Sequence, residues 1–217
     1  MAKTVLWKGV SIHIQSAIAA DQVVSSVTKA NPGVLEYVGA DPSDGDYILV
    51  KDVQGMHQIN DRVVRVANVN AGANTLELEG VNTTPFDTWV SGNMGVLTLG
   101  TSLATITQVN ASGGDFDRVD STTIHDLVRQ SEIGLASPLE ISMQSKWDPS
   151  DPGLVALKQA WEAAARLAMR IRFQNGAEIL LYGQVGATGL PTGGAQEIVQ
   201  TPVQLVANGM ATMYPGA

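Results

Sequence analysis

Apolar and polar residues alternate over short runs along most of this chain, and this pattern predicts β-strands. Val10, Ile12 and Ile14 alternate with polar neighbours, which is the period of two that a half-buried strand shows. Between residues 25 and 100, short runs of this kind are separated at close intervals by turn sequences such as "NPG" and "NAGAN". Close turns and short strands are typical of a small barrel or sandwich.

One segment instead has the spacing of a helix. Asp151 can cap its start and Pro152 suits the first helical position. Apolar residues then follow at intervals of three and four, which predicts a stripe that packs on a sheet. The residues of this stripe are Leu154, Leu157, Trp161, Ala165 and Ala168. A β-hairpin is expected next, because Asn175-Gly176 separates two apolar runs.

The order of these elements predicts a mainly β (α+β) fold. We expect a sandwich or barrel with one flanking α-helix, into which a second, small β-barrel is inserted. The predicted core domain is discontinuous and comprises residues 1–24 and 101–217, while residues 25–100 form the insert. A closed module can be inserted at an exposed turn wherever its two ends lie close together.

The segment from Ser112 to Ser137 is long, polar and poorly periodic. A connection of this length inside a compact domain is usually functional or disordered. We therefore interpret it as an irregular loop with a role in binding, although a solvated loop without function remains the alternative.

Composition narrows the possible functions. The formal net charge is −8, which argues against a protein that binds nucleic acid by neutralising phosphates. The chain contains no cysteine, so it has no disulfide, thiolate nucleophile or cysteine-ligated zinc. We also expect no secretory signal and no membrane-spanning segment, and therefore synthesis and assembly in a cytoplasm.

Chemical motifs are weak throughout. His13, His57 and His125 lie far apart in the sequence, which does not suggest a metal site. Ser121, His125 and Asp126 are neighbours in one polar stretch, whereas a catalytic triad needs groups brought together from separate elements. We predict no catalytic residue, no cofactor and no metal, and hence no enzymatic activity.

Three arginines, Arg166, Arg170 and Arg172, cluster after the predicted helix. In an acidic protein such arginines pair more often with carboxylates than with phosphate. If those carboxylates belong to a neighbouring subunit, the cluster is a set of ion pairs between subunits.

Several short motifs in the second half of the chain resemble the major tail (tail tube) proteins of long-tailed bacteriophages. They are "GGDFDRVDSTTIHD", "WDPSDPGLVAL", "RIRFQNGAEILLYGQV" and "TPVQL", and they occur in the same order as in that family. The resemblance extends from about Ile106 to Val206.

A second resemblance concerns the expected insert. Its "NPG" and "VQGMHQINDRVVRV" are similar to a small β-barrel named after the first catalytic cysteine half-domain of ubiquitin-activating enzymes. Two departures matter: the usual "HGL" is replaced by "ADP", and no cysteine is present, so no ubiquitin chemistry is implied.

The first resemblance implies a structural subunit of a virion tail, assembled in the bacterial host cytoplasm. Six copies would form a ring, rings would stack into a hollow tube, and DNA would pass through the lumen without specific binding. Other partners would be the tape measure, tail terminator and baseplate proteins. The polar segment would form the contact between rings through its charged residues, which are Asp115, Asp117, Arg118, Asp120, Asp126, Arg129 and Glu132.

Two other functions remain open at this point. The chain could be a β-rich binding module whose insert recognises a glycan or a protein, or it could be another tail component of the same fold, such as a terminator or baseplate ring. Assembly into tubes would distinguish the first alternative from the tail tube.

Overall fold

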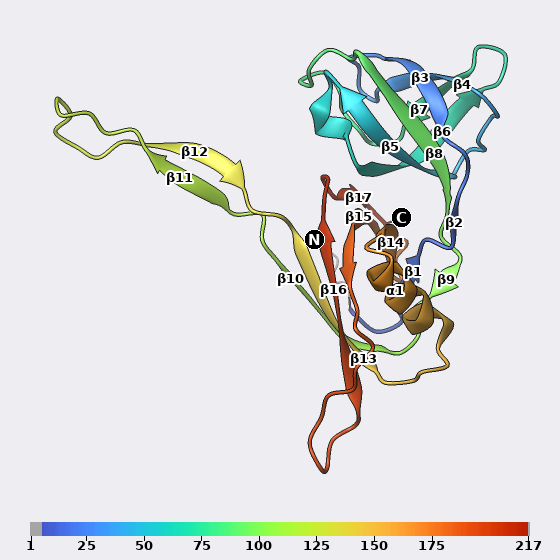
Figure 1. The fold of residues 1–217 in the computed structure, drawn as a ribbon. Coiled ribbons are helices and arrows are strands. Elements are labelled where there is room, and N and C mark those ends of the chain that lie inside the picture. The colour runs from blue at the N-terminus through green and yellow to red at the C-terminus, as the bar shows by residue number, and fades with distance from the viewer. Residues whose placement is uncertain (1–5, 217) are drawn as a thin grey trace.

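The computed structural model describes residues 6–216 and confirms the predicted mainly β fold with a flanking helix. The strands form a closed barrel, a larger open sheet and a separate two-stranded hairpin that projects away from the larger sheet (Figure 1). Along the sequence, the barrel strands come between the first and second strands of the larger sheet. The predicted domain division at residues 25 and 100 stays a prediction, because strand pairing does not show whether either part folds alone.

Six strands close the barrel in the order β8-β3-β4-β7-β6-β5, and β5 pairs back onto β8. Their apolar side chains alternate inward, as in β4, where Leu35 and Tyr37 are buried. A two-residue strand, β2, pairs with β8 outside this ring, and a short 3-10 helix, η1, lies between β5 and β6. The elements are β2 (Ala17–Ile18), β3 (Gln22–Val27), β4 (Val34–Val38), β5 (Tyr47–Gln54), η1 (His57–Ile59), β6 (Arg62–Asn70), β7 (Thr75–Leu78) and β8 (Ser91–Thr98).

The larger sheet has the order β10-β13-β16-β15-β14-β1-β9, and β17 pairs with β15 beside this path. Its neighbours in the order pair antiparallel, so that Met143 lies opposite Val203, for example. The predicted alternation holds here, since Ile12, Ile14, Ile141 and Met143 are all buried. The strands are β1 (Ser11–Ile14), β9 (Thr101–Ser102), β10 (Ile106–Ser112), β13 (Glu140–Lys146), β14 (Arg166–Arg172), β15 (Glu178–Gly186), β16 (Gln200–Ala207) and β17 (Thr212–Tyr214).

Helix α1 (Pro152–Glu162) starts as predicted but ends earlier. The Asp151 carboxylate accepts hydrogen bonds from the backbone N–H groups of Gly153 (2.7 Å) and Leu154 (3.1 Å), which confirms the N-cap. The predicted apolar stripe was wrong beyond Leu157: Trp161 is 43% exposed, and residues 165 and 168 lie outside the helix. The helix stops because Ala164 adopts the left-handed conformation (φ 48°) and the chain then continues into β14.

The barrel packs against the larger sheet through an apolar cluster with a polar rim. Leu49, Val63 and Leu97 of the barrel meet Leu180 and Tyr214 of the sheet, and all five are buried. This shared cluster fixes the position of the barrel, because moving it would expose apolar surface from both parts.

At the rim, Glu178 of β15 is only 3% exposed and accepts hydrogen bonds from the Tyr47 hydroxyl (2.8 Å) and Arg65 (3.3 Å) of the barrel. Arg172 contacts its other oxygen at 3.4 Å. Burial raises the pKa of Tyr214 to about 12, so its hydroxyl stays protonated while it accepts the Arg65 backbone N–H. Glu178 therefore joins two barrel side chains to the sheet through a buried negative charge.

We expect the substitution Glu178→Ala to lower the free energy of unfolding by about 3 kcal/mol, since it leaves Arg65 and Tyr47 without their buried partner. The matched control is Glu79→Ala, which removes the more exposed partner of Arg65 and is expected to cost about 1 kcal/mol or less. Urea unfolding followed by circular dichroism measures both. Equal losses for the two variants would contradict the role assigned to Glu178.

Candidate assembly surface

The projecting hairpin consists of β11 (Phe116–Asp120), β12 (Ser131–Ala136) and the turn between them; we call residues 116–136 the arm (Figure 1). No residue from 111 to 138 is buried. The arm carries seven large apolar side chains with exposed fractions between 57% and 102%. These are Phe116, Val119, Ile124, Leu127, Val128, Ile133 and Leu135. An exposed apolar surface on this scale marks a site that a partner covers.

The arm corrects the prediction of an irregular loop from Ser112 to Ser137. Strands β11 and β12 pair antiparallel, with Val119 opposite Glu132 and Asp120 opposite Ser131. Sequence periodicity did not reveal them because neither strand has a buried face, so its side chains do not alternate between core and solvent.

Two consecutive glycines connect the arm to the larger sheet. Gly113 and Gly114 both adopt positive φ angles, 88° and 83°. A Cβ added at Gly113 would lie 2.0 Å from the carbonyl oxygen of Pro138, so only glycine fits at this point. The two strands are held at the base by the backbone N–H of Gly114, which donates to the Ser137 carbonyl at 3.2 Å.

The charged residues predicted to contact another ring all lie on the arm or next to it, and all but Asp126, which is half-buried, are exposed. Within residues 6–216, none of them forms an ion pair. Two carboxylates are instead bound locally: Asp126 accepts from the backbone and hydroxyl of Thr123, which lowers its pKa, and Asp120 accepts from the Thr122 backbone. Both therefore stay ionised and available, and their role between rings stays a prediction.

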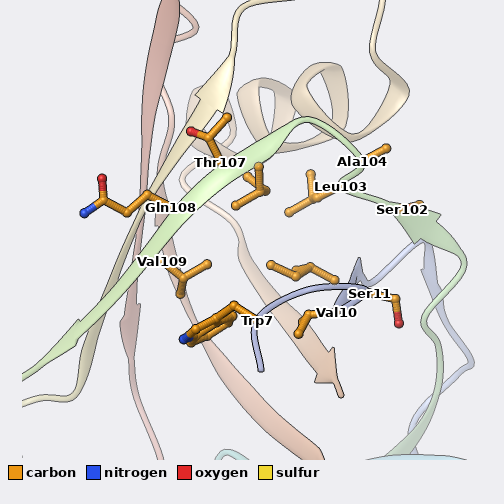
Figure 2. A pocket seen from close by; sticks show the side chains of 11 residues that line it. Trp7, Val10, Ser11, Ser102, Leu103, Ala104, Thr107, Gln108 and Val109 are labelled. Atoms are coloured by element: carbon orange, nitrogen blue, oxygen red, sulfur yellow. The ribbon is translucent and has the colours of Figure 1, made fainter. Parts of the chain in front are cut away.

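Sequence reasoning missed an uncharged groove of about 490 Å³ in the larger sheet. Its walls are the first half of β10 and the segment that leads into β1, and Figure 2 shows their side chains converging on the gap. We call this groove the seam, because it lies between strands near opposite ends of the sheet order. Its lining contains no charged residue and comprises Trp7, Val10, Ser11, Ile12, Ser102, Leu103, Ala104, Ile106, Thr107, Gln108 and Val109.

The apolar alternation at residues 10–14 is the sequence feature that pointed to part of the seam, because Val10 and Ile12 belong to its lining. Val10 and Ile12 were expected to face a core: Ile12 is buried and Val10 is partly buried against the same cluster, and both also line the seam. Trp7 stands at the mouth of the seam, 57% exposed, with its ring centroid 5.4 Å from that of Phe173. Which strands meet at the seam depends on long-range pairing, which local patterns do not encode.

One end of the larger sheet, strand β10, lies at the same place, and the two-residue strand β9 forms the other end. Among the described residues β10 pairs with β13 alone, whereas every strand of the barrel ring has a neighbour on both sides. An unpaired strand edge exposes backbone N–H and C=O groups that can pair with another chain. The larger sheet, and not the barrel, therefore offers an edge for assembly.

The three arginines predicted to pair between subunits have partners within the chain. Arg166 lies 3.6 Å from Asp61, and Arg172 lies 3.4 Å from Glu178. Arg170 donates to the Tyr47 hydroxyl at 3.2 Å. Pairing with a neighbouring subunit stays a prediction for all three.

The structure brings no catalytic or metal constellation together among residues 6–216. No group of three or more histidine and acidic side chains is placed to hold a metal ion. Asp126 hydrogen-bonds to Thr123, so it does not orient His125 toward Ser121. In the same part of the chain, no helix combines the length and the apolar character that crossing a bilayer requires.

Comparison with known protein families gives a match over most of the chain. The model of the family described as phage tail tube protein, TTP, matches residues 54–216, which is most of the chain. No curated protein matches the sequence.

The exposed turn of the arm should be the first site of proteolysis in the free subunit, since it has no packing to hold it. We expect limited trypsin digestion to cut first after Arg129, producing two large fragments that mass spectrometry identifies. The substitution Arg129→Gln should slow this first cut severalfold. A first cut within the barrel or the larger sheet would show that the arm is protected in the single subunit.

Proposed function

The chain belongs to the phage tail tube protein family, and on this premise we propose that six copies close into a ring and that rings stack into a hollow conduit for DNA. The family is structural and non-enzymatic, so the chain is a structural subunit of a virion tail. The ring number, the stacking and the passage of DNA are the parts that we propose beyond family membership.

The observation that carries this proposal is the arm. Full burial of one large apolar side chain contributes about 1.5–3 kcal/mol, and the arm presents seven such side chains to solvent. None of the seven side chains is buried within its own chain. A partner that buries several of them would therefore gain several times the free energy of burying one. A repeated contact of one face with a different face produces closed rings or open stacks, which is the geometry of a tube.

Contacts around the ring are supported by the free edge of β10. A neighbour that pairs with this edge satisfies its exposed backbone groups. The arm, with five carboxylates and two guanidinium groups from Asp115 to Glu132, supplies the contacts along the axis. Charges of both signs allow complementary pairing between successive rings.

The acidic composition supports passage of DNA without adhesion. With a net charge of −8 on each subunit, the assembled wall repels phosphates, and we propose that the luminal surface has a net negative potential. Because the charge is repeated in every subunit, the potential extends along the whole tube.

The barrel is proposed to face outward, because a module of its size would obstruct the channel. It forms a unit inserted into the tube subunit, with boundaries near residues 25 and 100. We also propose that the barrel has the fold of the cysteine half-domain of ubiquitin-activating enzymes. The chemistry of that domain is not part of the proposal, since the chain has no cysteine. Assembly in the host cytoplasm with tape measure, terminator and baseplate proteins completes the proposed role.

Purified protein should form tubes of regular width with a ring repeat when examined by negative-stain electron microscopy at increasing concentration. The substitution Ile133→Asp removes an exposed apolar side chain from the arm, so it should raise the concentration needed for assembly by about tenfold or more. The matched control is Val38→Asp on the barrel, at similar exposure, which should leave assembly unchanged. A monomer at all concentrations would contradict the proposed function.

Assembled tubes should not retain double-stranded DNA, because their surfaces repel phosphate. Tubes mixed with linear DNA at low salt and pelleted by centrifugation are expected to leave the DNA in the supernatant. Cosedimentation that added salt abolishes would contradict a negative lumen.

A further inference from the structure

We infer that the tip of the arm, residues 121–130, docks into the seam of a second copy of this chain. The inference rests on the proposed function and deepens it, because it names the surface on the neighbour that receives the arm. Three features support the pairing: the chemistry of the seam, the chemistry of the tip, and the reach of the arm.

The seam selects an apolar occupant. None of the residues that line it is charged, and six of them are large and apolar: Trp7, Val10, Ile12, Leu103, Ile106 and Val109. A charged group inserted here would lose its hydration without gaining a partner. An apolar side chain would instead bury its own surface together with that of the seam.

The tip matches this requirement. Ile124 and Leu127 are 96% and 102% exposed, the two highest values among the large apolar side chains of the described chain. The neighbouring carboxylate of Asp126 already accepts from Thr123 at 2.7 Å and 2.9 Å, so docking of Leu127 does not leave this charge without hydrogen bonds. The tip therefore presents apolar side chains beside a carboxylate that is satisfied internally, while Arg129, the other charged residue of the tip, is exposed.

The arm cannot place its tip in the seam of its own chain. A strand rises about 3.3 Å per residue, so a tip about ten residues beyond Gly114 lies roughly 35 Å from that hinge. The seam residues of β10 precede the same hinge by about five to eight residues, which places them only about 15–25 Å away. Folded back at Gly113 and Gly114, the arm would carry its tip past the seam. A second copy is the partner that its length allows.

A second groove beside the helix serves as the comparison surface. It lies between α1 and Trp147, and its lining includes Asp148, Lys158 and Glu162. Charged groups at this groove make it a poorer match for Ile124 and Leu127. It is equally open to a neighbour, which makes it the matched control for a test of contact.

The experiment uses introduced cysteines, because the natural chain has none and every disulfide must join two introduced residues. One chain carries Leu127→Cys at the tip, and a second carries Thr107→Cys on the exposed rim of the seam. In the control, the second chain carries Val155→Cys in the helix groove instead. The substituted chains are co-assembled as a minority with unsubstituted protein, so that tubes form even if a variant assembles poorly, and are then oxidised.

Disulfide formation requires Cα atoms within about 7 Å, so a cross-link reports direct contact. We expect the tip and seam cysteines to give a disulfide-linked dimer on non-reducing gels, at about ten times the yield of the tip and helix pair. Ile124→Cys should reproduce the result as an independent tip variant.

Each outcome bears on one claim. If tubes form and the helix cysteine cross-links to the tip as efficiently as the seam cysteine does, the proposed contact between arm and seam is wrong. The contact is also wrong if tubes form and neither cysteine cross-links. In both cases the proposed assembly into tubes still stands. If the unsubstituted protein forms no tubes, the proposed function fails, and this contact fails with it.

Discussion

The apolar side chains of the arm lie on a two-stranded hairpin that has no buried residue. An isolated hairpin in water is marginally stable, because strand pairing alone hardly exceeds the entropy cost of ordering the chain. In this protein the pairing of β11 with β12 persists beyond the body although the arm has no buried residue. We propose that such an element gains its main stabilisation from neighbouring copies of the chain, which a tail tube subunit meets on self-assembly.

The barrel and the larger sheet, unlike the arm, bury their apolar side chains within the single chain. The barrel closes on itself and shares a buried cluster with the larger sheet, and Glu178 ties Tyr47 and Arg65 to that sheet. A body held together in this way positions the arm, the seam and the free edge of β10 relative to one another. Rigid placement matters for a polymer, since a small angular error at each contact accumulates over many rings. The barrel thus contributes to a fixed subunit shape, beyond any role of its own.

Local patterns predicted most of the fold. The alternation at Ile12 and Ile14, the Asn175-Gly176 turn and the Asp151 cap each depend on nearby residues, and each is found in the structure. Features that depend on distant contacts were not predicted. The helix ends at Glu162 because the residues that follow pair with β15 as strand β14. The strands of the arm have no buried face, so their sequences do not alternate between apolar and polar residues. The seam depends on which strands end the sheet, so no local signal specified it. The charged residues of the arm could be placed on an exposed segment, but local sequence does not specify what they contact.

Hydrogen exchange compared between free subunits and assembled tubes tests the central claim most directly. The account predicts that amide groups of residues 116–136 exchange quickly in the free subunit, where a hairpin without a core opens easily, and slowly in the tube. Barrel amides should change little, since their hydrogen bonds are complete in the single chain. Equal and rapid exchange of the arm in both states would show that neighbours do not cover it, and would contradict the account.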